Sequence, residues 1–331
     1  MGTIQSFLNK EPIMNISGVT YANKRNVKSK KTVIIFIIVL IFLVLIGVLA
    51  ISVYVAWSLI HPEKAELPKF SSNIVIEYED VQFKDINKTI TLNGWNFKAK
   101  GSDKTIIMAH GYKNNRLQFN EKTLDLISGL QSRGFNVFTF DFRNSGISGG
   151  DKTTIGINEK DDLLGAIKYV KSIGGKHIVL MGFSMGASTA IHAAAESPDV
   201  EAVIADAPFA DMDAYLKDNL SVWSSLPKVP FNNTILLMLK FLANLDPKTM
   251  VPKKDIQSVA PRPVMLIHGK DDDAIPIKNS EEIYEAYTQI NKENITFWKV
   301  DGAKHVGSYE KDTKEYMKNI YEFLEKVYGT K

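Results

Sequence analysis

The chain has 331 residues, of which 45% are hydrophobic and 23% are charged, a composition typical of a folded protein. Its formal net charge of +3 arises near the N-terminus, because residues 1–31 hold six Lys and Arg against one Glu and leave the rest at −2. A near-neutral body argues against a nucleic-acid partner, and the absence of cysteine excludes disulfides, thiolate nucleophiles and cysteine-based metal sites.

An uncharged run rich in Ile, Val and Leu occupies residues 32–60. About 20 such residues cross the core of a bilayer as a helix, so the run predicts one transmembrane helix. The alternative is a cleaved signal peptide, whose apolar region has about 7–15 residues and ends in small residues. Ala50 and Ser52 resemble such a site, but Tyr54, Trp57 and other apolar residues follow them, and we expect an uncleaved signal anchor.

The charges that flank this run predict its orientation. Basic residues crowd the N-terminal flank, whereas residues 61–64 carry no net charge when His61 is neutral. By the positive-inside rule, the N-terminus is cytoplasmic and the body lies on the extracytoplasmic side of the cell membrane. We therefore expect a cytoplasmic basic tail at 1–31, a transmembrane helix at 32–60, a linker at 61–73 and one folded domain at 74–331.

After Pro68 the pattern changes to short runs typical of β-strands. The runs 74–83 and 89–97 predict an antiparallel pair joined near Asn87. Beyond them, strand runs alternate with helical patterns, which favours crossover units and a mainly parallel sheet with helices on both faces. We expect further strands at 105–109, 137–140, 177–181, 200–205, 264–267 and 295–300, and helices at 119–133, 159–173, 187–196, 280–290 and 309–327.

The alternation of strands and helices stops between Pro208 and Pro261. This stretch contains the apolar run 235–239. We interpret 208–260 as a helical cap inserted above the sheet, in which the apolar run serves the packing of the cap helices.

Residues 182–186, Gly-Phe-Ser-Met-Gly, directly follow an expected strand and open an expected helix. A serine on such a sharp strand-to-helix turn is exposed as a nucleophile, and the flanking glycines let strand and helix approach closely. Ser148 lies in a second match to the same spacing, at 146–150, but no helix opens there. Ser184 is therefore the predicted nucleophile.

The turn around Ser184 resembles that of α/β-hydrolases, and other stretches of residues 74–327 resemble the same family in the same order. The likeness is greatest to membrane-anchored bacterial hydrolases of unassigned substrate. It implies the α/β-hydrolase fold, with a mostly parallel eight-stranded sheet, helices on both faces and a helical cap. It also implies that nucleophile, acid and histidine follow one another in that order along the chain.

Two loops fit this resemblance. His110 and Gly111, after a buried strand, resemble the family's H-G loop, which implies that the backbone N–H groups of Tyr112 and Met185 form an oxyanion hole. His110 itself is expected to be structural. Residues 141–148 resemble the D-x-R-G-x-G-x-S loop, with Asn144 in place of a glycine; asparagine tolerates left-handed backbone angles, so we expect a structural loop there.

The acid is expected in the triple aspartate that follows the strand at 264–267. Residues 268–276 resemble the pattern H-G-x-x-D-x-x-V-P, and this alignment implies Asp272. The neighbouring Asp271 and Asp273 remain alternatives, as does Asp206 at the end of an earlier strand. A calcium loop is disfavoured because residues 274–276 supply no further oxygen ligands at alternate positions.

Six histidines compete for the role of base. His305 lies in a loop between the last strand and the last helix, after both nucleophile and acid, which is the position that the family order requires. The other five are ascribed to the membrane flank, the H-G loops, a strand start and a helix interior; they are His61, His110, His177, His192 and His268.

The sequence thus predicts a serine hydrolase with the catalytic residues Ser184, Asp272 and His305, and a carboxylic ester is the expected substrate class. Amide or peptide hydrolysis, acyl transfer to an alcohol and a non-catalytic binding protein on the same fold remain alternatives. No metal or organic cofactor is implied. The expected partners are a small-molecule or lipid-like acyl substrate and the membrane; the oligomeric state is left open.

Overall fold

The computed structural model describes residues 15–16, 19–20, 28–68 and 77–329, and the chain divides into two compact units, Met1–Leu49 and Ala50–Lys331. Most of the predicted basic tail and residues 74–76 of the first predicted strand lie outside the described residues. The first unit contains a short antiparallel pair, β1 (Asn15–Ile16) and β2 (Val19–Thr20), and the greater part of helix α1 (Lys28–Ile60).

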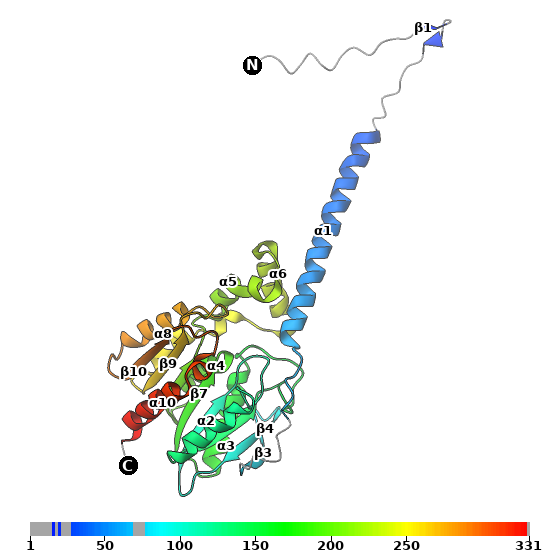
Figure 1. The fold of residues 1–331 in the computed structure, drawn as a ribbon. Coiled ribbons are helices and arrows are strands. Elements are labelled where there is room, and N and C mark those ends of the chain that lie inside the picture. Colours follow the sequence, from blue (N-terminus) through cyan, green and yellow to red (C-terminus); the bar gives the residue numbers. More distant parts are fainter. Residues whose placement is uncertain (1–14, 17–18, 21–27, 69–76, 330–331) are drawn as a thin grey trace. The chain divides into compact units, whose positions relative to one another are not determined.

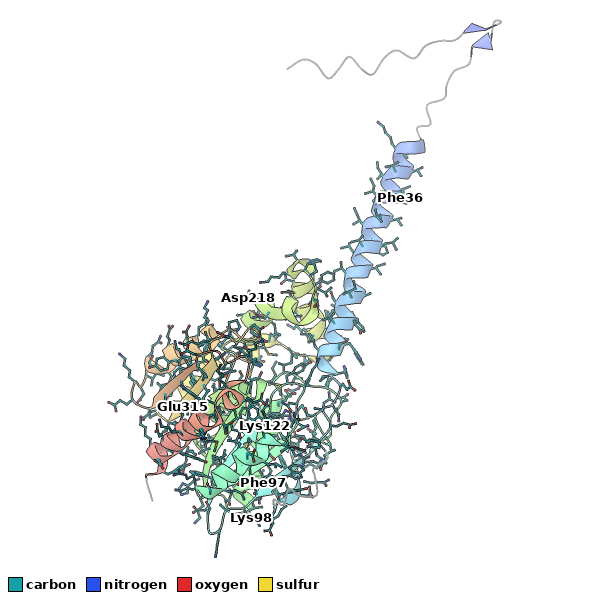
Figure 2. The ribbon with its side chains drawn as sticks, viewed as in Figure 1. Phe36, Phe97, Lys98, Lys122, Asp218 and Glu315 are labelled. Carbon is teal, nitrogen blue, oxygen red and sulfur yellow. The ribbon has the colours of Figure 1, made fainter. Side chains whose placement is uncertain are left out.

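Helix α1 is apolar on all sides over most of its length. Its large side chains from Val33 to Leu49 are exposed, and Phe36, labelled in Figure 2, is 67% exposed. The segment Lys30–Ile60 is long and apolar enough to cross a membrane. A helix that is apolar all round requires an apolar solvent rather than water.

The second unit is built on a sheet whose strands follow the order β10-β9-β8-β7-β5-β6-β4-β3. The pairs β3–β4 and β4–β6 are antiparallel, and the remaining pairs are parallel. The mostly parallel eight-stranded sheet expected from the sequence is confirmed. Its strands are β3 (Glu79–Lys84), β4 (Thr91–Phe97), β5 (Lys104–Ala109), β6 (Asn136–Asp141), β7 (His177–Phe183), β8 (Val200–Asp206), β9 (Val264–Gly269) and β10 (Ile295–Val300).

Helices cover both faces of this sheet (Figure 1). Alternate strand residues separate the core into two layers, because successive side chains point to opposite faces. Ile107 and Leu180 pack with α3 (Glu159–Ser172), α4 (Met185–Glu196), α7 (Pro252–Val259) and α8 (Lys278–Thr288), whereas Ile106 and Val179 pack with α2 (Lys122–Ser132) and α10 (Thr313–Tyr328). Both layers are closed by strongly amphipathic helices.

The segment between β8 and β9 is helical, as expected. Helices α5 (Met212–Ser224) and α6 (Lys228–Ala243) pack against each other, and a short 3-10 turn, η1 (Pro247–Thr249), follows. Helix α7 packs against α4 and α8 and is part of the layer that covers the sheet. The last predicted helix is divided into α9 (Ser308–Lys311) and α10, because Asp312 leaves helical geometry and its carboxylate caps the amide of Glu315.

The last turns of α1 are part of the second unit. Ala56 and Ile60 are fully buried in its core. The carbonyl oxygen of Ile60 accepts a hydrogen bond from the amide of Thr153 at 2.8 Å, and the hydroxyls of Ser52 and Thr234 lie 2.7 Å apart. One face of this segment therefore packs as an ordinary core helix.

Candidate active site

Ser184 occupies a strained turn between β7 and α4. Its backbone has φ 53° and ψ −118°, angles that residues with a side chain rarely adopt. Gly186 allows the turn, because a Cβ at this position would collide with the carbonyl oxygens of Ala109 and His110. The amide of Ser184 donates to the carbonyl oxygen of Asp206 at 2.8 Å, which fixes the turn to the end of β8.

The structure brings together the three side chains that the sequence nominated. Nε2 of His305 lies 2.8 Å from Oγ of Ser184, and Nδ1 of His305 lies 2.7 Å from Oδ2 of Asp272. Two backbone hydrogen bonds hold the loops of acid and base together, since the amides of Lys270 and Asp271 donate to the carbonyl oxygens of Val300 and Ala303. In this geometry, the imidazole can receive the hydroxyl proton while the carboxylate faces its other nitrogen.

Asp272 sits in a buried and fully bonded position. Its Oδ1 accepts hydrogen bonds from the amides of Ala274 and Ile275, at 3.0 and 2.8 Å. Burial raises the pKa of Asp272, but hydrogen bonds from His268 and His305 outweigh burial and lower that pKa to about 2. The carboxylate is therefore ionised at neutral pH.

The alternative acids have different surroundings. Asp271 and Asp273 are exposed. Asp206 is fully buried at the end of β8, where its Oδ2 accepts a hydrogen bond from the hydroxyl of Tyr316 at 3.1 Å. Burial raises the pKa of Asp206 to about 7. Of the four aspartates, Asp272 is the one bonded to His305.

The H-G loop and the 141–148 loop have structural contacts. Nε2 of His110 accepts a hydrogen bond from the amide of Phe142 at 3.0 Å, and burial lowers the pKa of His110. Ser148 is buried, and its Oγ donates to the carbonyl oxygen of Asp141 at 2.6 Å. Asn144 has φ 54°, the left-handed geometry that the sequence predicted. These contacts give Ser148 and His110 roles in holding the loops.

An apolar pocket opens at the nucleophile. It contains about 480 Å³ of space and is open on one side. Met185 and Tyr112, the two predicted oxyanion-hole residues, both line it next to Ser184. The residues that line it, all within the described part of the chain, carry no charged group; they are Leu59, Tyr112, Ile155, Ser184, Met185, Phe209, Tyr215, Leu216, Leu220 and Ile275. A larger open hollow around Lys104 and Tyr328 includes no residue of the triad.

Leu59 is a pocket residue that the sequence analysis missed. It lies in the last turn of α1, and its carbonyl oxygen accepts a hydrogen bond from the hydroxyl of Tyr112 at 2.7 Å. The sequence signal of this segment is only its hydrophobicity, which fits a membrane span and a pocket wall equally well. Within residues 28–68 and 77–329, no group of three or more His, Asp and Glu side chains is placed to hold a metal ion.

Comparisons with known proteins agree with this fold and site. The sequence pattern of the prolyl oligopeptidase family matches residues 117–331. Uncharacterized protein YqkD of Bacillus subtilis (strain 168) is 32% identical over 240 residues, which cover 71% of this chain and 76% of YqkD. The solved structure of the Pyrococcus furiosus esterase Pf2001 matches with a TM-score of 0.63 and 28% identity, over 80% of this chain and 98% of the esterase.

A more distant relative is the lysophosphatidylserine lipase ABHD12 of Danio rerio, which is 23% identical over 209 residues that cover 59% of this chain and 50% of the lipase. Together, the sheet and these similarities define an α/β-hydrolase of the esterase, peptidase and lipase type. Within that class, the chain belongs to the prolyl oligopeptidase family.

Proposed function

We propose that this protein is a serine hydrolase that forms an acyl-enzyme and that carboxylic esters are its substrates. The observation that carries the proposal is the unbroken hydrogen-bond path from Ser184 through His305 to Asp272. A serine hydroxyl is a weak nucleophile until a neighbouring base accepts its proton. This path supplies that base and the carboxylate that orients it.

The proposed reaction has two halves. In the first, Oγ of Ser184 attacks the substrate carbonyl as Nε2 of His305 takes its proton, and the protonated imidazole then gives this proton to the departing alkoxide. In the second, His305 removes a proton from water, which attacks the acyl-enzyme and releases the acid. Asp272 remains ionised throughout, because its pKa is about 2, and it stabilises the imidazolium.

Negative charge collects on the carbonyl oxygen in both tetrahedral intermediates. We assign its two hydrogen-bond donors to the backbone N–H groups of Tyr112 and Met185, which border the pocket beside Ser184. Met185 is the first residue of α4, where backbone N–H groups lack partners within the helix. Each such donor contributes about 3–4 kcal/mol to stabilisation of the transition state.

The chemistry of the pocket favours an ester with an apolar acyl group. Its lining is aliphatic and aromatic, so an acyl chain loses contact with water on entering it. A peptidase is the second candidate, because the matching family is the prolyl oligopeptidase family. We also propose that α1 is an uncleaved anchor that leaves its N-terminus in the cytoplasm and the hydrolase domain outside the cell membrane.

The test of catalysis uses the full-length protein in detergent and a fluorophosphonate probe. We expect the wild type to be labelled and Ser184→Ala to be unlabelled, with a loss of about 10⁴-fold or more in turnover for Ser184→Ala and for His305→Ala. Ser148→Ala is the matched control, since it removes the serine of the other G-x-S-x-G match, and it should still be labelled. Equal labelling of wild type and Ser184→Ala would reject the proposal.

A substrate screen separates the two candidate reactions. p-Nitrophenyl esters of increasing chain length are compared with aminoacyl p-nitroanilides on the same preparation. An ester hydrolase is expected to turn over the esters with a chain-length optimum and to leave the anilides intact. Efficient cleavage of an anilide would favour the peptidase instead, and ester formation with added alcohols would indicate an acyltransferase.

A further inference from the structure

Helix α6 carries exposed apolar side chains. Phe241 is 76% exposed and Leu237 is 50% exposed. The two residues are four positions apart, so they lie on the same face of the helix. Val229, at the start of the same helix, is 81% exposed. Single exposed apolar residues are ordinary, and a further observation is needed to identify what covers this face.

That observation is the contact between α6 and α1. Ser52 and Thr234 share a hydrogen bond of 2.7 Å between their hydroxyl groups. Counted from Thr32, the first residue after the N-terminal charges, about twenty helical residues at 1.5 Å each span the roughly 30 Å of a bilayer core. This count ends at Ile51, so Ser52 marks the edge of the core, and Thr234 brings α6 to the same level.

The next turn of α1 has the composition of a membrane interface. Tyr54 is 72% exposed and Trp57 is 53% exposed, on the side of the helix that does not pack into the core. Tyr and Trp are enriched where a spanning helix meets the headgroup layer. Their positions agree with the count of helical residues.

The same helix end reaches the pocket. Leu59 follows Ser52 by seven residues, about 10 Å along the helix axis, and it lines the pocket of Ser184 together with Leu216 and Leu220 of α5. The pocket thus shares a wall with the helix that leaves the bilayer. An acyl chain that passes from the membrane to Ser184 would meet apolar surface on the way.

We propose that the exposed face of α6, formed by Val229, Leu237 and Phe241, lies in the interfacial layer of the membrane and that the pocket takes acyl esters that reside in that membrane. The second half rests on the proposed function. The partner of this face is a lipid surface, because the contact with α1 holds it at the edge of the bilayer.

The membrane contact is tested by fluorescence in full-length protein. The chain contains no cysteine, so Phe241→Cys provides a single site for an environment-sensitive dye. Ile290→Cys, an exposed apolar position after α8, is the matched control. In phosphatidylcholine vesicles with brominated acyl chains, the dye at 241 should be quenched and the dye at 290 should not. Equal emission with and without bromine at 241 would overturn the proposal, including the case in which a second copy of the chain covers the face.

The substrate half is tested with Leu237→Ser/Phe241→Ser. We expect its rate on a long-chain fluorogenic ester embedded in the vesicles to fall about tenfold, the effect of roughly 1.4 kcal/mol of lost insertion energy, while its rate on soluble p-nitrophenyl butyrate is unchanged. The control Ile173→Ser/Ile290→Ser removes two exposed isoleucines elsewhere and should change neither rate.

The outcomes separate the two proposals. Unchanged hydrolysis of the embedded ester by the α6 variant, or an equal loss on both substrates, overturns the inference. A wild type that hydrolyses neither substrate rejects the proposed function and the substrate half with it. Quenching at position 241 is read without any activity and still decides whether α6 contacts lipid.

Discussion

Nε2 of His268 lies 3.2 Å from Oδ2 of Asp272, and both side chains are fully buried. His268 is also bonded to Ser280 and to the carbonyl oxygen of Ile275, at 2.7 Å each. One carboxylate oxygen of Asp272 therefore faces two histidines, and His305 is the one that also reaches Ser184. We infer that His268 positions the acid from the side away from the nucleophile.

Replacing His268 tests this positioning role. In His268→Leu, the carboxylate loses one hydrogen bond and can rotate, and a misplacement of about 1 Å is expected to reduce kcat up to about 10²-fold with little change in KM. The pKa of Asp272 should also rise, because the His268 hydrogen bond is one of the interactions that lower it. Ester hydrolysis measured from pH 4 to pH 9 reads both effects.

His268→Gln keeps a hydrogen-bond donor and is the matched variant. It should recover part of the lost turnover if positioning is the role of His268. Circular dichroism confirms that both variants are folded at the assay temperature. A kcat equal to that of the wild type in the folded Leu variant would contradict the role.

Asp272→Asn and Asp206→Asn distinguish the two candidate acids. Loss of the Asp272 carboxylate should reduce kcat by about 10⁴-fold, the size of effect known when a triad aspartate becomes an amide. Asp206→Asn should keep kcat within about threefold of the wild type, a difference of less than 1 kcal/mol in activation free energy. Initial rates with one p-nitrophenyl ester give both values. The reverse ranking would move the acid to Asp206.

The buried carboxyl of Asp206 also predicts a pH dependence of stability. Burial raises its pKa from 3.8 to about 7 in the folded chain, so folding favours the protonated form. The stabilisation is complete below pH 3.8 and is lost as the pH rises through 7. Asp206→Asn remains neutral at every pH, and its Tm relative to that of the wild type should therefore rise by several degrees between pH 5 and pH 9.

Thermal unfolding of both proteins across this pH range measures the difference. Tyr316→Phe serves as the companion variant, because it removes the hydroxyl bonded to Asp206 without changing any charge. It should be less stable than the wild type at both pH values. Parallel Tm curves for the wild type and Asp206→Asn would show that this carboxyl does not titrate in the range.

The catalytic candidates could be nominated from the sequence because each has a local signature. The Gly-rich turn identifies Ser184, and the H-G-x-x-D spacing identifies Asp272. His305 followed from the order of the chain rather than from any motif. The sheet was predictable for the same reason, since its buried strands are short apolar runs between helices, and only their ends shifted by a few residues.

Leu59 and the second role of His268 were not predictable, because each depends on a meeting of distant segments. Leu59 is one apolar residue in a long apolar run, and nothing local tells which side chains of that run face Tyr112 rather than lipid. His268 fitted its H-G pattern fully, and its bond to Asp272 appears only when the loop folds back over four residues. The break between α9 and α10 depends on one capping contact of Asp312.

The packed end of α1 gives the last prediction, which concerns where the hydrolase domain can be cut. A fragment of residues 50–331 retains Ala56, Leu59 and Ile60, whereas a fragment of residues 62–331 loses them all. The shorter fragment would expose the core beneath Ile60 and remove one wall of the pocket. Burial of these side chains is worth about 4 kcal/mol, which corresponds to about 10 °C in Tm for a domain of this size.

Purification of both fragments in mild detergent and thermal unfolding give the comparison. The longer fragment should keep the kcat/KM of the full chain on p-nitrophenyl butyrate, and the shorter one should be both less stable and less active. Ala56→Asp in the longer fragment is a point-variant control, because it places a charge in the same buried interface and should also lower Tm. Equal stability of the two fragments would mean that the helix end contributes nothing to the domain, and Leu59 would then have no part in shaping the pocket.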